Sequence, residues 1–482
     1  MRQKSITVNL ITNGIKTLMS VLFPLITFPY ASRVLGTVGI GKVSYAASII
    51  SYFSLIASLG INTYAVREGA RIRDDREKFN KFAKEILNIN LFTTVVSYAL
   101  LIIFLKMPVL TGYKTLLVIS SAGIVFTTIG MEWLFVIKEE YTYITKRAIL
   151  FQILSLVLLF LLVRSKEDYY WYAALTVISS GGSAVLNLWH SRKFVDWRKH
   201  HVYEYKKHFK PIFLIFGTSL ASSIYMTMDT TMLGAMRGDS AVGVYTAAVK
   251  INLVVSTLIG TISSTILPRV SYYIGNGLKK EYERLMKSSM DILLMISVPA
   301  AVGMICTSDI LILLFSGAEF LAGTMAAKIL SAKVLVGAVN RVFAYQICTP
   351  YKKDREVLIS TASGAVFNLF ANAVLIPTVG VTGAAIATLC SELVVFLVLA
   401  KYAKDLLKIG PLFHRMPVYL TASIWFFGAR LFVHQFSLSQ TVELVITVAV
   451  SMCGYFGILL LIKDPYLHQY INKFLRILKQ KH

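Results

Sequence analysis

Long apolar runs recur along the whole chain and are separated by short polar stretches. A run of roughly 20 apolar residues forms a helix long enough to cross the ~30 Å hydrocarbon core of a bilayer. Only 15% of the 482 residues are charged and 56% are hydrophobic, whereas soluble domains contain about 25% charged residues. The sequence therefore predicts an all-α polytopic membrane protein and excludes an ordinary soluble domain.

The apolar runs predict about 14 transmembrane helices. Their approximate ranges are 7–31, 40–61, 85–105, 115–137, 147–163, 170–190, 211–234, 241–267, 287–307, 324–347, 356–376, 379–400, 416–433 and 440–462. The longest predicted outer connection, 308–323, is shorter than the ~50 residues of a small domain. Cys306, Cys348, Cys390 and Cys453 are far apart and form no CxxC or Cys/His cluster. We therefore expect a protein that is not an enzyme, carries no cofactor or metal, and acts through its helices.

The distribution of Lys and Arg predicts the orientation. Of the 49 basic residues, 36 fall in segments that are cytoplasmic if the N-terminus is inside, 8 fall in outer segments and 5 lie within helices. Cytoplasmic loops are enriched in Lys and Arg, so both termini are predicted to be cytoplasmic. The net charge of +24 is then explained by topology and by attraction of the loops to anionic membrane lipids, and no nucleic-acid partner is predicted.

A weak internal repeat predicts the domain organisation. Val-Gly pairs at 38–39, 242–243 and 379–380 each precede an Ala-Ala pair within the next helix. Small residues on a helix face permit close packing in membranes. The pattern favours two six-helix lobes around a central cavity, at 1–205 and 206–402, followed by two further helices and a tail at 403–482.

Two lysines are predicted near the middle of the bilayer. Lys16 and Lys250 each lie about nine residues into a helix, which places them about 13 Å deep at 1.5 Å per residue. A charge at that depth costs about 2.5–3.5 kcal/mol on insertion scales, so it needs a function or a partner. The two lysines could face one cavity from opposite lobes and bind an anionic head group. Each could instead form an ion pair with a carboxylate such as Asp229, Asp291 or Glu392.

Four further basic residues are candidate binding residues. Lys333 and Arg341 could line an aqueous cavity, whereas Lys328 is expected to extend to the outer interface. Arg33 and Lys42 flank the first outer turn, where they could receive or release an anion or simply anchor the helices.

Acidic residues do not gather at one depth in the sequence. Glu132, Asp229, Asp291, Glu392 and Glu443 lie mostly toward predicted helix ends. No cage of carboxylates for a coupling cation is evident, and Asp229 and Glu392 are kept as candidate coupling residues or ion-pair partners.

Residues 23–36 (FPLITFPYASRVLG) closely resemble the first-helix signature of Wzx-type polysaccharide repeat-unit flippases of the multidrug/oligosaccharidyl-lipid/polysaccharide exporter superfamily. The resemblance continues at 39–48, 60–68, 229–234, 243–250 and 383–388 and spans essentially the whole chain. Thr230 departs from the pattern, because the family often has a basic residue after the aspartate.

The resemblance implies alternating access and a polyprenyl-diphosphate-linked oligosaccharide as substrate. It also implies a bacterial cell membrane location, a role in capsule, O-antigen or exopolysaccharide synthesis, and a polysaccharide polymerase as a potential partner. The alternatives are a peptidoglycan lipid-precursor flippase or a cation-coupled drug exporter of the same superfamily. A membrane polysaccharide polymerase fits less well, because the predicted outer loops are short.

Overall fold

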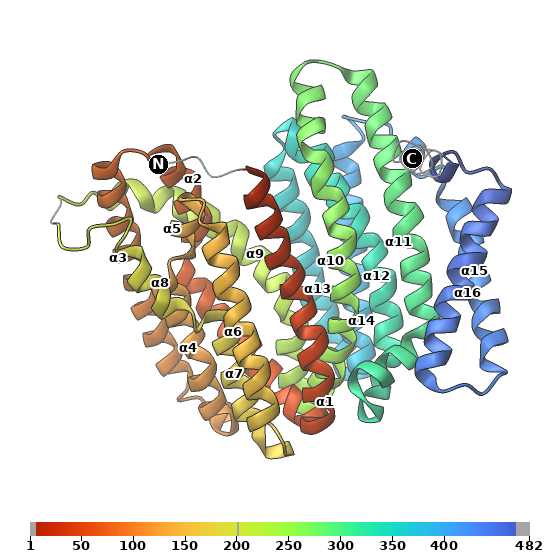
Figure 1. Cartoon of the computed structure of the whole chain (residues 1–482), viewed down its shortest axis with the longest axis horizontal. Helices are drawn as coiled ribbons and strands as arrows, with labels where there is room; N and C mark the ends of the chain where they lie inside the picture. Colours follow the sequence, from red (N-terminus) through yellow and green to blue (C-terminus); the bar gives the residue numbers. More distant parts are fainter. Residues whose placement is uncertain (1–5, 200–201, 469–482) are drawn as a thin grey trace, which may run out of the picture. The chain divides into compact units, whose positions relative to one another are not determined.

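A computed structural model describes residues 6–199 and 202–468, which form long helices joined by short connections (Figure 1). In the first half the helices are α1 Ile6–Ser58, α2 Ile61–Arg71, α3 Arg76–Phe104, α4 Lys114–Gly130, α5 Glu132–Ile137, α6 Tyr141–Leu162, α7 Tyr169–Gly181, α8 Ala184–Ser191 and α9 Lys206–Arg237. They are followed by α10 Asp239–Gly275, α11 Lys279–Ser316, α12 Thr324–Val342, α13 Asp354–Val379, α14 Val381–Ala403, α15 Met416–His434 and α16 Gln440–Leu461. The all-α polytopic class is confirmed.

The helix α1 contains the first two predicted spans. Gly36 interrupts it with φ 66° and ψ −175°, a backbone conformation that is not helical. Glycine adopts a positive φ without the steric cost that a Cβ atom imposes. The chain can therefore reverse at Gly36 without a loop.

Twelve helical ranges in the described part of the chain are long and apolar enough to cross a membrane. One of them, Thr12–Arg71, includes both predicted spans of α1. The predicted sixth span, 170–190, consists of two shorter helices, α7 and α8, separated by Gly182 and Ser183. The chain is thus a multi-pass membrane protein, and the number 14 stays a prediction.

The chain divides into two compact units, Met1–Gly243 and Val244–His482. Within the first unit, α9 packs against α1 and α2, so its contacts group it with the preceding helices. The lobe division predicted from the sequence instead begins the second lobe at residue 206, and it stays a prediction. In the second unit, α15 and α16 pack against α11 and against each other.

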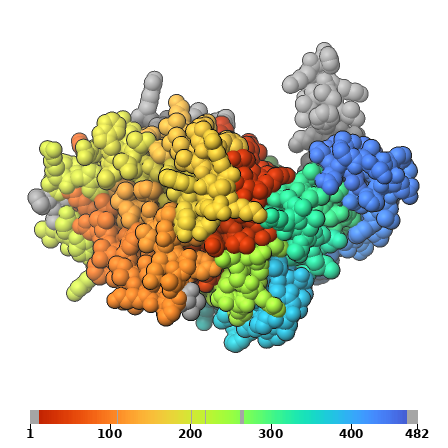
Figure 2. All heavy atoms as spheres, turned by 90° about the horizontal axis from the view of Figure 1, so that it is seen from below, coloured from red at the N-terminus to blue at the C-terminus, as the bar shows by residue number. Residues whose placement is uncertain are grey.

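Each unit has its own apolar core. In the first, buried side chains such as Phe79, Trp133 and Phe135 bring together α2, α3 and α5. In the second, Tyr282, Phe343 and Tyr455 belong to a cluster shared by α11, the segment after α12, and α16. Seen from below, the ends of α3 and α4 (orange) and of α6 and α7 (yellow) form one closely packed surface, as expected from the contacts of α4 and α6 with α7 (Figure 2).

The small residues after the predicted outer turns do permit close packing. A Cβ atom at Gly41 would lie 1.8 Å from the carbonyl oxygen of Asp239, and one at Gly243 would lie 1.9 Å from that of Thr37. The backbones of α1 and the start of α10 are therefore in direct contact within the first unit.

Gly243→Ala should lower the thermal unfolding midpoint of the purified protein. The added methyl group would overlap the Thr37 carbonyl, so the backbone must shift, and overpacking of this kind costs about 1–3 kcal/mol. Gly217→Ala is the matched control, because a Cβ atom there has nothing within 4 Å. Equal midpoints for the two variants would contradict this account of the contact.

Candidate functional site

Three of the predicted binding residues, Lys250, Lys333 and Arg341, lie in the second unit on α10 and α12. These helices are joined at Asn252, whose amide donates to the Ala327 carbonyl at 3.3 Å and accepts from the Ser331 hydroxyl at 3.0 Å. This contact fixes how α10 and α12 are aligned along their lengths, and with it the positions of the basic residues that they carry.

Arg341 lies against the backbone of α10. A Cβ atom at Gly260 would be 2.7 Å from Nη1 of Arg341, so the guanidinium group occupies the space beside this glycine. The partly buried Lys250 precedes Gly260 by ten residues, or about 15 Å along the helix. Lys250 and Arg341 therefore provide positive charge at two separate levels of α10.

Lys333 forms an ion pair within the same unit. Its Nζ is 3.5 Å from Oε1 of Glu392, and the Asn340 amide donates to Oε2 of Glu392 at 2.7 Å. Glu392 is 7% exposed. Glu392 is a candidate partner for Lys16 or Lys250 from the sequence, and the packing of α12 against α14 brings it to Lys333.

In the first unit, Lys16 on α1 forms an ion pair with Glu132, the first residue of α5. Nη2 of Arg147, on α6, lies 3.9 Å from the other oxygen of Glu132. Sequence reasoning named three other carboxylates as potential partners for Lys16 and missed Glu132. The reason is local, because α4 ends at Gly130 and Met131 (φ 42°) then turns the chain into α5.

The remaining predicted residues of the first unit lie apart from Lys16. Arg33 is exposed and donates from Nη1 to the Pro29 carbonyl at 2.8 Å. The Nζ of Lys42 is 4.8 Å from the centroid of the Tyr169 ring. Arg33 is 17 residues, or about 25 Å, along α1 from Lys16.

Asp229 on α9 is 5% exposed. Its role as a coupling residue or ion-pair partner, and the binding roles of Arg33 and Lys42, stay predictions.

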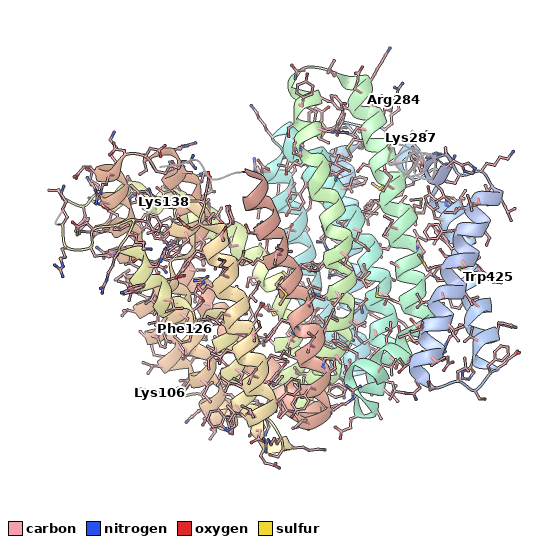
Figure 3. The ribbon with its side chains drawn as sticks, viewed as in Figure 1. Lys106, Phe126, Lys138, Arg284, Lys287 and Trp425 are labelled. Atoms are coloured by element: carbon pink, nitrogen blue, oxygen red, sulfur yellow. The ribbon has the colours of Figure 1, made fainter. Side chains whose placement is uncertain are left out.

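A pocket of about 380 Å³ lies within the first unit. Its polar lining comes from α4, α5, α6 and α8 and includes Thr127, Glu132, Trp133, Arg147 and Asn187. Phe126, which also lines the pocket, lies between Lys106 and Lys138, which mark opposite ends of this unit (Figure 3). The pocket is thus set among the helices, next to the Lys16–Glu132 ion pair.

Two helix breaks form the walls of this pocket. The carbonyl at the end of α4, on Gly130, accepts a hydrogen bond from Nδ2 of Asn187 on α8 at 2.5 Å. A Cβ atom at Gly181, where α7 ends, would be 2.7 Å from Cβ of Phe126 on α4. The breaks at α4–α5 and α7–α8 are therefore in direct contact, through Asn187 at one and Gly130 at the other.

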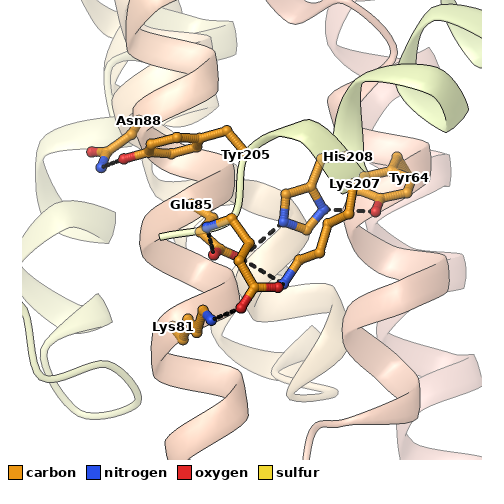
Figure 4. Close-up of polar contacts among 8 residues, drawn as sticks. Tyr64, Lys81, Glu85, Asn88, Tyr205, Lys207 and His208 are labelled. Carbon is orange, nitrogen blue, oxygen red and sulfur yellow. Dashed lines mark hydrogen bonds and ion pairs between the residues drawn. The ribbon is translucent and has the colours of Figure 1, made fainter. Parts of the chain in front are cut away.

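A separate polar cluster anchors the start of α9 (Figure 4). The fully buried carboxylate of Glu85 accepts from the backbone N–H of Glu204 at 2.7 Å and lies 2.9 Å from Nε2 of His208. Nζ of Lys207 is 3.3 Å away, and the Tyr64 hydroxyl is 2.7 Å from Nδ1 of His208. The cluster joins α2, α3 and α9, and its buried groups bind one another, so we interpret it as structural.

Two family models match long parts of the chain. The family described as "Polysaccharide biosynthesis protein" matches residues 6–273, and the one described as "Lipid II flippase MurJ" matches residues 183–451.

Curated relatives carry transporter names. A putative O-antigen transporter of Escherichia coli (strain K12) is 24% identical over 388 residues, which cover 77% of this chain and 90% of that protein. A probable low-salt glycan biosynthesis flippase, Agl15 of Haloferax volcanii, is 26% identical over 195 residues, or 40% of each chain.

Solved structures show the same fold. The inward closed conformation of lipid II flippase MurJ gives a TM-score of 0.74 at 15% identity and covers 95% of this chain and 99% of that one. An inward-facing multidrug resistance MATE family transporter of the MOP superfamily gives 0.62 at 14% identity, with 80% and 95% covered.

Proposed function

Because the chain belongs to the polysaccharide biosynthesis protein family, we propose that it moves polyprenyl-diphosphate-linked oligosaccharides from the cytoplasmic to the outer leaflet of a bacterial cell membrane. The observation that carries the proposal is the match of this family over 6–273, together with relatives named as an O-antigen transporter and a glycan flippase. Both termini are cytoplasmic in this proposal, and a polysaccharide polymerase acts on the delivered units.

The charges within the helices support this substrate. A diphosphate that crosses hydrocarbon needs fixed positive charge and strong hydrogen-bond donors. In the proposal, Lys250 and Arg341 contact the diphosphate during the alternating-access cycle, and Lys16 contacts it when its ion pair with Glu132 separates. Lys333 sets the local charge of this region through its ion pair with Glu392.

Arg33 and Lys42 act in the release of the lipid-linked unit at the outer side. They flank the turn at Gly36, which the proposed topology places at the outer face.

The pairing of the carboxylates favours a lipid diphosphate over a cationic drug. Glu132 is held by Lys16 and Arg147, and Glu392 by Lys333. A carboxylate already paired with a cation is a poor site for a second cation, because binding would require the first pair to separate. Asp229 is the proposed coupling residue.

A peptidoglycan precursor flippase is the second candidate. It is favoured by the MurJ family match over 183–451 and by the TM-score of 0.74. In both candidate functions the protein moves a lipid diphosphate, and the two substrates differ in the glycan attached to it.

Deletion of the gene should cause lipid-linked oligosaccharide repeat units to accumulate in the inner leaflet, while peptidoglycan synthesis continues. Units in the outer leaflet can be measured by their accessibility to an added glycosidase in intact spheroplasts. The purified protein, reconstituted into vesicles, should restore that accessibility for added lipid-linked units. Unchanged accessibility in cells that have no redundant flippase would reject the proposal, and accumulation of the peptidoglycan precursor instead would favour the second candidate.

A further inference from the structure

The pocket of the first unit contains buried polar atoms that lack partners. Among the described residues, Nε1 of Trp133, Nε of Arg147 and Oδ1 of Asn187 have no hydrogen-bond partner. These residues are 2%, 8% and 1% exposed, and all three line the pocket. A buried polar group without a partner typically costs about 1–3 kcal/mol, so these three atoms would gain a missing partner from a ligand in the pocket toward which their side chains turn.

The pocket also offers oxygen atoms that can accept hydrogen bonds. The hydroxyl groups of Thr127 and Ser180 donate to the carbonyls of Gly123 and Thr176 within their own helices. Their lone pairs can therefore accept from a ligand. The carboxylate of Glu132, whose side chain is 47% exposed, is a further acceptor.

This mixture of donors and acceptors selects the chemistry of the ligand. An oxyanion would be repelled by the Glu132 carboxylate and would leave the Asn187 oxygen without a donor. A metal cation would be repelled by the Arg147 guanidinium and would face the Trp133 N–H. A hydroxyl group donates one hydrogen bond and accepts others, so a neutral ligand with several hydroxyl groups satisfies both sets.

We propose that this pocket binds one sugar ring of the oligosaccharide that the chain transports. The inference rests on the proposed function and adds to it a glycan site within the first unit, distinct from the cations assigned to the diphosphate. The volume of about 380 Å³ suits a small ligand. The partly exposed ring of Phe126 provides apolar contact for the C–H face of a sugar.

The pocket adjoins the ion pair between Lys16 and Glu132, so an occupied pocket changes the surroundings of a residue assigned to the diphosphate. The glycan and the diphosphate of one substrate would therefore be bound by neighbouring groups.

Trp133→Phe tests the site because it removes the unpartnered N–H and keeps a large aromatic ring. The probe is the free oligosaccharide released by mild acid from the lipid-linked pool of the source cells, and binding to the purified full-length protein is measured by saturation-transfer NMR. Loss of one neutral hydrogen bond should weaken binding about fivefold. Trp189→Phe is the matched control, because Trp189 on α8 is 67% exposed and does not line the pocket.

Trp133→Phe should lower the thermal unfolding midpoint, because the smaller ring leaves space in the core of the first unit, so binding is compared at a temperature at which both proteins are folded. If this variant does not fold, Thr127→Val serves instead, since it removes a lining hydroxyl at nearly constant volume. Inorganic diphosphate should not displace the oligosaccharide.

Wild-type affinity in Trp133→Phe, no saturable binding by the wild type, or displacement by diphosphate would overturn the glycan site. None of these three outcomes depends on the transport assay, so each would reject the glycan site without rejecting the proposed function. A failure of the transport assay with intact, saturable sugar binding would instead reject the proposed function.

Discussion

Lys250→Ala is expected to reduce transport per inserted molecule roughly 30-fold, while the protein still folds and inserts. A hydrogen bond to a charged group contributes about 2 kcal/mol, and a loss of that size in the transition state for transport gives this factor. The measurement is the rate at which added lipid-linked oligosaccharide becomes accessible in reconstituted vesicles, divided by the amount of protein in the same vesicles.

Lys250→Arg should retain part of the activity, since it keeps the charge and changes the shape of the donor group. Lys106→Ala is the control for a lost positive charge, because Lys106 lies at one end of the first unit, outside the helices (Figure 3). If Lys250 served only to neutralise a buried group, its removal would lower stability instead. Unchanged transport in Lys250→Ala, or a loss that disappears after correction for protein amount, would contradict the binding role.

Glu85→Ala is expected to lower the free energy of unfolding by about 3 kcal/mol, because it removes the buried acceptor shared by Glu204, Lys207 and His208. The start of α9 would lose its anchor to α3. The measurement is the midpoint of thermal unfolding of the purified protein in detergent.

Glu77→Gln is the matched control for Glu85→Ala. Glu77 lies on the same helix and pairs with Lys199, but its side chain is 65% exposed, so the pair contributes about 0–1 kcal/mol. Similar midpoints for the two variants would show that the cluster in Figure 4 does not anchor α9.

The charged residues show where prediction from the sequence stops. Its position in the first apolar run marks Lys16 as a deep cation that needs a function or a partner, and the structure supplies Glu132 as the partner. These two residues are 116 positions apart, and no spacing rule connects them. Glu392 was recognised as a candidate ion-pair partner, but only the packing of α12 against α14 assigns it to Lys333.

The sequence does not predict the pocket of the first unit either. The run at 170–190 is apolar enough to predict one continuous span, yet the chain breaks at Gly182 and Ser183. A signal was present, because Gly181 and Gly182 are adjacent and glycine weakens a helix by about 1 kcal/mol relative to alanine. Whether such a pair breaks a helix depends on what packs against it, here Phe126 beside Gly181 and Phe151 beside Gly182.

The sequence by itself determined the membrane class, the helical fold and the resemblance to polysaccharide flippases. Transfer of apolar residues into lipid is favourable residue by residue, so a local run is enough to predict a helix in the membrane. Only the tertiary structure decided which carboxylate meets which lysine and where buried polar atoms lack partners. Ion pairs and hydrogen bonds act over less than about 4 Å, so they depend on how helices distant in the sequence pack together.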